Sequence, residues 1–206
     1  MTFELRDYQK ECLDNVYRSL RKGNKCIVVQ SPPRTGKTVI MAEIARRTTA
    51  KGNRILFIVH RKEIVDQVKK TFAEQNVKPE FCQIGMVQTF TRNINKLAKP
   101  DVILVDEAHH ALAKTYMKVL DAFPNAVKLL FTATPVRMGR LQLDQIATDI
   151  VEGKQIQELM DTGFLAPFRY FARKKIDDDK LKKSSTGDFT VGSMTDAIEG
   201  GIYQAV

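Results

Sequence analysis

A Gly-Lys-Thr sequence at 36–38 is the strongest indication of chemistry in this chain of 206 residues. It ends the segment SPPRTGKT, residues 31–38, which lies between an apolar run and a helical pattern. A loop between a strand and a helix offers backbone N–H groups to phosphate oxygens, while Lys37 can reach the β and γ phosphates and Thr38 can ligate Mg²⁺. These residue types predict a P-loop that binds a nucleoside triphosphate with Mg²⁺.

The loop differs from the usual P-loop pattern at two positions. Ser31 stands at the position of the first glycine, and Arg34 stands where related ATPases often have glycine. A side chain at Arg34 either crowds the phosphates or contacts them, and the sequence leaves both open. The loop residues expected to bind the nucleotide are Arg34, Thr35, Gly36, Lys37 and Thr38.

Two adjacent carboxylates are the second candidate for chemistry. Asp106 and Glu107 directly follow the apolar run VILV at 102–105. Ligands of parallel sheets bind at the carboxyl ends of the strands, so Asp106 is expected to hold Mg²⁺ and Glu107 to orient and deprotonate the attacking water. An acidic helix N-terminus, stabilised by the helix dipole, is the plainer interpretation of the pair. The P-loop earlier in the chain favours the catalytic interpretation, with Lys37 as the third catalytic residue.

Strands and helices that alternate along the chain must position these residues. The apolar runs lie at 26–30, 55–59, 102–105 and 127–131. The helical patterns lie at 37–51, 61–75, 87–98 and 112–121. An opening helix is expected from Tyr8 to Leu20, with Asp7 as its N-cap and Gly23 as its stop. This alternation predicts the α/β class, with a mostly parallel sheet and helices on both of its faces.

Weaker patterns surround this core. A strand at 81–87 is weakened by Gly85, and a helix is expected from Ile156 to Gly163. A further strand is expected at 168–171, followed by the charged and polar stretch KKIDDDKLKKSSTGDFT. We predict a domain over 1–173 and a linker or C-terminal extension over 174–206.

The overall composition indicates a partner class and excludes others. There are 33 Lys and Arg residues against 24 Asp and Glu, and a net charge of +9 attracts a polyanion such as nucleic acid. The three cysteines lack the spacing of a disulfide framework or a zinc site. The apolar runs are far shorter than a membrane-spanning helix, and the N-terminus lacks the pattern of a secretory signal. We therefore expect a cytoplasmic protein without a membrane span.

Six segments resemble, in order, the motifs of superfamily 2 helicases and translocases. They are LRDYQ at 5–9, SPPRTGKT at 31–38, VHRKEIVDQ at 59–67, GMVQTF at 85–90, VDEAH at 105–109 and TATP at 132–135. Within the superfamily, the DEAH form and the later GFLAPFRY at 163–170 look most like phage or prophage helicases and the RadD-like bacterial proteins. The resemblance implies a RecA-like P-loop NTPase domain that uses ATP and Mg²⁺.

The resemblance also implies roles for individual residues. The residues that would bind the base are Gln9, which reads adenine, and its supports Arg6 and Tyr8. The residues that would contact the nucleic-acid backbone are Arg61, Gln88 and Thr89. The residues that would couple ATP hydrolysis to movement are Thr132 and Thr134, with Arg137 following as in many relatives.

The function implied is that of the N-terminal motor domain of an ATP-dependent DNA helicase or translocase. Nothing after residue 137 resembles motifs IV to VI of a second RecA-like domain, which carries the arginine finger, so we expect a first-motor-domain fragment with negligible ATPase activity by itself. The alternatives are a restriction or repair motor that moves without unwinding, an RNA helicase, and a nucleotide-sensing switch protein. A small-molecule kinase would not explain the VHRKE and VQTF segments.

Overall fold

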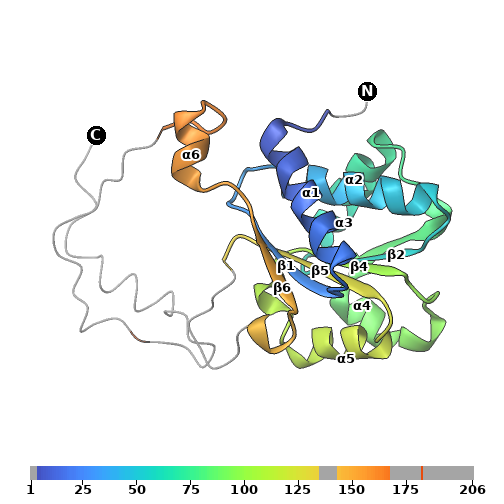
Figure 1. The fold of residues 1–206 in the computed structure, drawn as a ribbon. Coiled ribbons are helices and arrows are strands. Elements are labelled where there is room, and N and C mark those ends of the chain that lie inside the picture. Colours follow the sequence, from blue (N-terminus) through green and yellow to red (C-terminus); the bar gives the residue numbers. More distant parts are fainter. Residues whose placement is uncertain (1–3, 135–142, 168–181, 183–206) are drawn as a thin grey trace, which may run out of the picture. The chain divides into compact units, whose positions relative to one another are not determined.

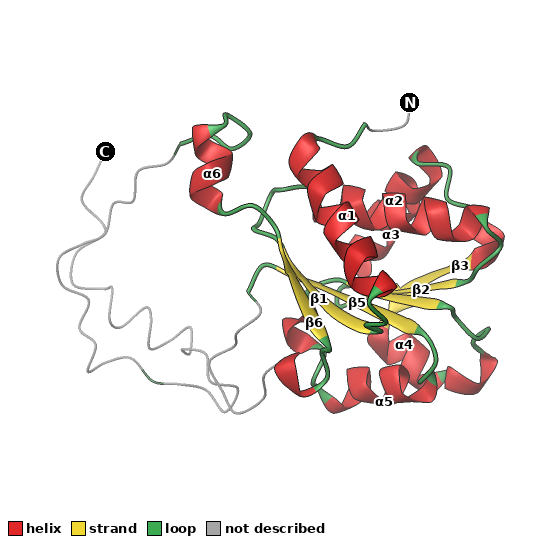
Figure 2. Ribbon diagram, in the orientation of Figure 1, coloured by secondary structure: helices red, strands yellow, loops and turns green. Residues whose placement is uncertain are grey.

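A computed structural model describes residues 4–134, 143–167 and 182. Its centre is a six-stranded sheet with the strand order β3-β2-β4-β5-β1-β6 (Figures 1 and 2). The strands are β1 (Cys26–Gln30), β2 (Ile55–Val59), β3 (Cys82–Met86), β4 (Val102–Val105), β5 (Val127–Thr132) and β6 (Asp149–Glu152). Every neighbouring pair is parallel, so all six carboxyl ends lie along one edge of the sheet.

Helices cover both faces of this sheet, as the alternating pattern predicts (Figure 2). The helices are α1 (Asp7–Arg21), α2 (Lys37–Ala50), α3 (Lys62–Glu74), α4 (Val87–Arg92), α5 (Lys114–Ala122) and α6 (Ile156–Asp161). Helices α1, α2 and α3 pack on one face, and α4 and α5 pack on the other. The predicted fold class is confirmed.

The two cores explain why β2 and β4 are apolar at every position. In β2, Phe57 and Val59 pack in the core beneath α1, α2 and α3, while Leu56 and Ile58 pack in the core beneath α4 and α5. All four side chains are fully buried. Burying such a side chain contributes about 1.5–3 kcal/mol, so a polar residue at any of these positions would be costly.

Two predicted helix boundaries are wrong. Helix α1 begins one residue earlier than an Asp7 cap requires, because Arg6 is the extended N-cap residue and its N–H donates to Gln9 Oε1 at 3.0 Å. The helix expected over 87–98 ends at Arg92 and is followed by a 3-10 turn, Ile94–Lys96. There the Asn93 side chain donates to Thr89 O at 3.0 Å, which competes with helix continuation. The stop at Gly23, with φ +92°, is confirmed.

Two strands at the edges of the sheet were harder to predict. Gly85 does not weaken β3, because the ring of Phe90 packs where a side chain would lie: a Cβ at residue 85 would be 2.8 Å from Phe90 Cζ. Strand β6 was not predicted, because only Val151 of its four residues is buried. It is fixed to α1 through Asp149, which accepts hydrogen bonds from Ser19 and Asn24.

The sheet and its helices form one compact unit of residues 1–136 and 141–165, and residues 137–140 and 166–206 form a second unit. The predicted strand at 168–171, the position of Arg137 and the predicted boundary at 173/174 lie outside the described residues. The helix expected before Gly163 is confirmed as α6. Within the described ranges, no helix has the length and apolar character needed to cross a membrane.

Candidate nucleotide-binding site

The carboxyl edge of the sheet gathers the motif residues that follow the described strands. The P-loop follows β1, Asp106 follows β4, and Thr132 ends β5, which lies between those two strands. On the other half of the edge, Arg61 follows β2 and Gln88 and Thr89 follow β3. Thus the topology places the expected nucleotide residues beside one another and the expected nucleic-acid residues on the neighbouring strands.

The P-loop is held by its own hydroxyl groups. Ser31 Oγ and Thr35 Oγ1 lie 2.7 Å apart, and Thr35 Oγ1 donates to Pro32 O at 2.7 Å. Both hydroxyl side chains are buried. The hydroxyl group of the serine that replaces the expected glycine therefore stabilises the loop. The Ser31 backbone N–H also donates to Thr132 O at 3.0 Å, which joins the loop to β5.

Two loop residues adopt left-handed backbone conformations. Gly36 has φ +77°, and Arg34, which carries a side chain, has φ +63°. A residue other than glycine in this region costs about 1 kcal/mol or more, so the surrounding hydrogen bonds must hold Arg34 in place. Its side chain is exposed to solvent.

Lys37, the first residue of α2, directs its ammonium back over the loop. Nζ donates to Ser31 O at 3.2 Å and to Pro32 O at 3.3 Å. Both partners are neutral carbonyls, and in the described part of the chain no carboxylate lies within 4.0 Å of this ammonium. No ion pair among the described residues therefore neutralises this charge, which is suited to an anionic ligand.

The acidic pair is partly buried and bent at its second residue. Glu107 has φ +52°, and its backbone N–H donates to Asp106 Oδ1 at 3.0 Å. Burial, followed by the Glu107 carboxylate, raises the pKa of Asp106, whereas the Glu107 N–H and the Lys37 ammonium lower it. A nearby cation would stabilise the ionised form of a carboxyl group in this position.

Two further side chains lie beside this pair: His109, the last residue of the VDEAH segment, and Tyr116, which lies outside all of the motifs. His109 Nδ1 lies 3.3 Å from Glu107 Oε2, without hydrogen-bond geometry. The hydroxyl of Tyr116 is buried and has no partner among the described residues. Burial and the charges of Asp106 and Glu107 raise the pKa of Tyr116 to about 12, so it stays a neutral donor at physiological pH.

The start of α1 is tied to the P-loop by two side chains. Tyr8 Oη donates to Thr35 O at 3.0 Å, and Gln9 Nε2 donates to the same oxygen at 2.9 Å. Gln9 is only 4% exposed, and a Cβ at Gly36 would lie 2.5 Å from its Nε2. The Gln9 amide retains a second N–H and a second lone pair, the pair of groups that recognition of an adenine edge requires.

The expected nucleic-acid and coupling residues differ in exposure. Arg61, the N-cap residue of α3, and Thr89 are exposed, whereas Gln88 Oε1 is buried without a partner within the described ranges. Thr132 is fully buried, and its hydroxyl both donates to Thr134 O and accepts from Thr134 N, each at 3.1 Å. These contacts fix the backbone just after β5.

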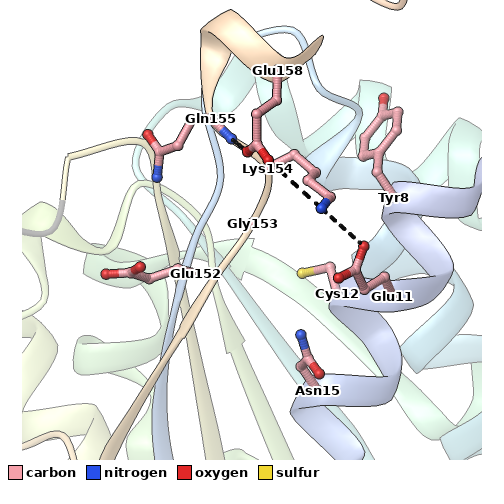
Figure 3. Close-up of a pocket in the computed structure, with 9 residues that line it drawn as sticks. All are labelled: Tyr8, Glu11, Cys12, Asn15, Glu152, Gly153, Lys154, Gln155 and Glu158. Carbon is pink, nitrogen blue, oxygen red and sulfur yellow. Dashed lines mark hydrogen bonds and ion pairs between the residues drawn. The ribbon is translucent and has the colours of Figure 1, made fainter. Parts of the chain in front are cut away.

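A small polar pocket of about 210 Å³ lies between α1 and the segment after β6 (Figure 3). Lys154 crosses it, with Nζ 3.5 Å from Glu11 Oε2 and 3.7 Å from Glu158 Oε1. The neighbouring Gly153 packs against the P-loop strand, since a Cβ there would lie 3.0 Å from Gln30 O. No sequence motif indicated these contacts, because their two sides are about 120 to 140 residues apart in the chain.

Comparisons with known proteins agree with this geometry. The family model described as type III restriction enzyme, res subunit, matches residues 2–93 and 74–137. A 51.5 kDa protein of a Lactococcus phage is 36% identical over 176 residues, which cover 85% of this chain and 39% of that protein. The putative ATP-dependent helicase IRC3 of Saccharomyces cerevisiae is 30% identical over 221 residues, covering 93% of this chain and 32% of that protein. This chain therefore spans less than half the length of either relative.

A comparison with solved structures finds a similar fold. The crystal structure of the UvsW helicase from bacteriophage T4 matches 73% of this chain and 60% of its own, with a TM-score of 0.58 and 18% identity. That likeness concerns the fold, while the family model covers most of the motif-bearing residues. The chain belongs to the family of the type III restriction enzyme res subunit, and its described core is the first RecA-like domain of a superfamily 2 helicase motor.

Proposed function

We propose that this domain binds ATP with Mg²⁺ and, together with a second RecA-like domain, hydrolyses it to drive movement along DNA in the cytoplasm. The observation that carries the proposal is that Lys37 and Asp106 lie at the same edge of the sheet. Lys37 begins α2 directly after the loop that follows β1, and Asp106 directly follows β4. The Lys37 ammonium lowers the pKa of the Asp106 carboxyl group without forming an ion pair with it. A cation for phosphate and an anion for metal at one edge of a parallel sheet are the requirements of phosphoryl transfer.

The donor set fits Mg²⁺ and a triphosphate. Thr38 offers a hydroxyl and Asp106 a carboxylate, which are the hard oxygen ligands that Mg²⁺ prefers. Backbone N–H groups of Thr35, Gly36 and Lys37 would bind phosphate oxygens, and the Lys37 ammonium would leave the carbonyls of the loop for the β and γ phosphates. The bound metal ion would offset the negative charge of these oxygens.

Glu107 is the proposed general base. Its carboxylate lies beside Asp106 on the backbone bend, where it would orient a water molecule toward the γ phosphate. Charge that develops on the γ phosphate needs an arginine finger, and we propose that the second RecA-like domain supplies it. Since an arginine finger contributes roughly 10³ to 10⁵ in rate, this 206-residue chain alone is expected to show negligible turnover.

DNA is the proposed track. Arg61, Gln88 and Thr89 follow adjacent strands and are the proposed contacts to the phosphate backbone, and the net charge of +9 favours a polyanion. Thr132 and Thr134 are the proposed couplers, since Thr132 O accepts the Ser31 N–H and so joins the loop after β5 to the P-loop. The family description, a restriction-enzyme subunit, favours a restriction motor that moves along DNA without unwinding it as the second candidate function.

Hydrolysis and binding can be tested separately. In a form of the protein that hydrolyses ATP, Glu107→Gln is expected to retain ATP binding and lose turnover, while the exposed Glu80→Gln serves as a control. Unchanged turnover in Glu107→Gln would reject Glu107 as the general base. Robust DNA-stimulated turnover by the 206-residue chain alone would reject the need for a second domain.

The track is tested by binding to single-stranded DNA, duplex DNA and RNA over a salt series. Arg61→Ala is expected to weaken DNA binding. It should also reduce the slope of log binding constant against log salt concentration by about one. Arg21→Ala, in the last turn of α1, is the control. Preference for RNA over both DNA forms would overturn the DNA assignment, and strand-displacement assays on the active form separate unwinding from movement alone.

A further inference from the structure

Phe164 is a half-exposed aromatic residue whose backbone is firmly held at the end of α6. Gly163, with φ +74°, ends the helix, and Phe164 N–H then donates to Leu159 O at 2.8 Å. The side chain remains 40% exposed. Because its backbone is fixed and its ring is open to solvent, Phe164 is suited to hold a flexible side chain in one position.

The ring of Phe164 contacts two residues of the opening motif that ends at Gln9. It meets the Tyr8 ring edge to face, with centroids 5.0 Å apart at an interplanar angle of 65°. The Arg6 guanidinium carbon lies over the Phe164 ring, 5.5 Å from its centroid. Both distances are within the range of favourable aromatic and cation–π contacts.

These contacts continue to the P-loop. Arg6 Nη1 donates to Tyr8 Oη at 3.4 Å, and Tyr8 Oη donates to Thr35 O at 3.0 Å. The Arg6 backbone N–H donates to Gln9 Oε1 at 3.0 Å. The Arg6 side chain is therefore held at the ring of Phe164 and at the hydroxyl of Tyr8, while its backbone contacts the amide proposed to read adenine.

We propose that Phe164 is a positioning residue for the nucleotide base: it holds the Arg6 guanidinium as a flat cation on which adenine stacks beside Gln9. The inference rests on the proposed function, because it deepens the ATP site described there. A guanidinium plane stacks well on aromatic rings, and a purine is such a ring. Phe164 itself touches Arg6 and Tyr8 rather than the base.

The effect of the ring is preorganisation. A free arginine side chain has about 2 kcal/mol of rotamer entropy to lose on binding, and part of that cost is removed when the side chain already lies on the Phe164 ring. The phosphate contacts of the P-loop do not depend on this ordering. Loss of the ring should therefore weaken the binding of a nucleotide but not the binding of its phosphate chain alone.

The test compares ATP with inorganic tripolyphosphate, each with Mg²⁺, by equilibrium binding to the 206-residue chain. Phe164→Ala is expected to weaken ATP binding by about 3- to 10-fold and to leave tripolyphosphate binding within about 2-fold. Phe164→Tyr is expected to restore ATP binding. Ile156→Ala is the matched control, because Ile156 is also 40% exposed and lies on α6.

A double-mutant comparison tests the route through Arg6. In an Arg6→Ala background, Phe164→Ala is expected to cause no further loss of ATP affinity, since there is no guanidinium left to position. Equal losses for ATP and tripolyphosphate in Phe164→Ala, or an undiminished loss in the Arg6→Ala background, would overturn the inference. If the wild type itself bound ATP no better than tripolyphosphate, the proposed base site at Arg6 and Gln9 would fail instead.

Discussion

Replacing Gly36 by alanine isolates the contact between the opening helix and the P-loop. Gly36 and Gly52 have nearly the same φ, +77° and +78°. A Cβ at Gly52 meets nothing within 4 Å, whereas a Cβ at Gly36 would lie 2.5 Å from Gln9 Nε2. Each alanine incurs about 1 kcal/mol for the left-handed conformation, so the difference between the two variants reports on Gln9 alone.

The magnitude follows from the hydrogen bonds of Gln9. Its amide must move away from residue 36 and abandon Thr35 O, while the side chain is only 4% exposed. A buried amide left unpaired costs about 1–3 kcal/mol, so Gly36→Ala should destabilise by about 2–4 kcal/mol and Gly52→Ala by about 1. Urea unfolding of both variants measures this difference.

A Gln9→Ala background provides the internal check. With the amide removed, Thr35 O still accepts from Tyr8, and the Cβ of residue 36 has room. The excess cost of Gly36→Ala over Gly52→Ala should then fall below about 0.5 kcal/mol, the usual limit of additivity. Equal destabilisation by the two alanines in the wild type, or an excess that persists without Gln9, would refute the reasoning.

Two further substitutions test the packing and electrostatics of the site. Burial raises the pKa of Asp106, so the ionised carboxylate destabilises the folded state. Asp106→Asn should therefore raise the free energy of unfolding at neutral pH. This gain should shrink as the pH falls toward the pKa of an unfolded aspartate, about 4, because Asp106 is then protonated in the folded state. Thermal melts across pH measure this, and a loss of stability at neutral pH would contradict it. Gly85→Ala should cost about 1–3 kcal/mol in urea unfolding, because the new Cβ meets the buried ring of Phe90 at 2.8 Å. Adding Phe90→Leu should recover part of this cost, and no recovery would exclude the ring contact as its cause.

The centre of the sheet was predictable because its strands are buried on both faces. Positions such as Leu56 and Phe57 face opposite cores, so the sequence of β2 is an uninterrupted apolar run of strand length. Motif spacing likewise located Lys37 and Asp106, since each closely follows such a run. Their side-chain roles stay predictions.

The edges of the sheet and the contacts between distant segments were not predictable in the same way. Strand β6 has one buried residue, so its pattern has no clear period, and its attachment depends on Ser19 far upstream. Gly85 was interpreted as a strand breaker because the sequence does not reveal which ring needs the space. The contact of Phe164 with Tyr8 joins residues more than 150 positions apart and depends on the tertiary fold.

The central claim, a P-loop that binds ATP, is tested most directly by equilibrium binding of a fluorescent ATP analogue with Mg²⁺ to this chain. Lys37→Ala is compared with the wild type and with Lys51→Ala, an exposed lysine at the other end of α2. The account predicts binding by the wild type and Lys51→Ala, with at least about a tenfold loss, or about 1.4 kcal/mol, in Lys37→Ala. Equal affinity in all three proteins, or no binding by the wild type, would contradict it.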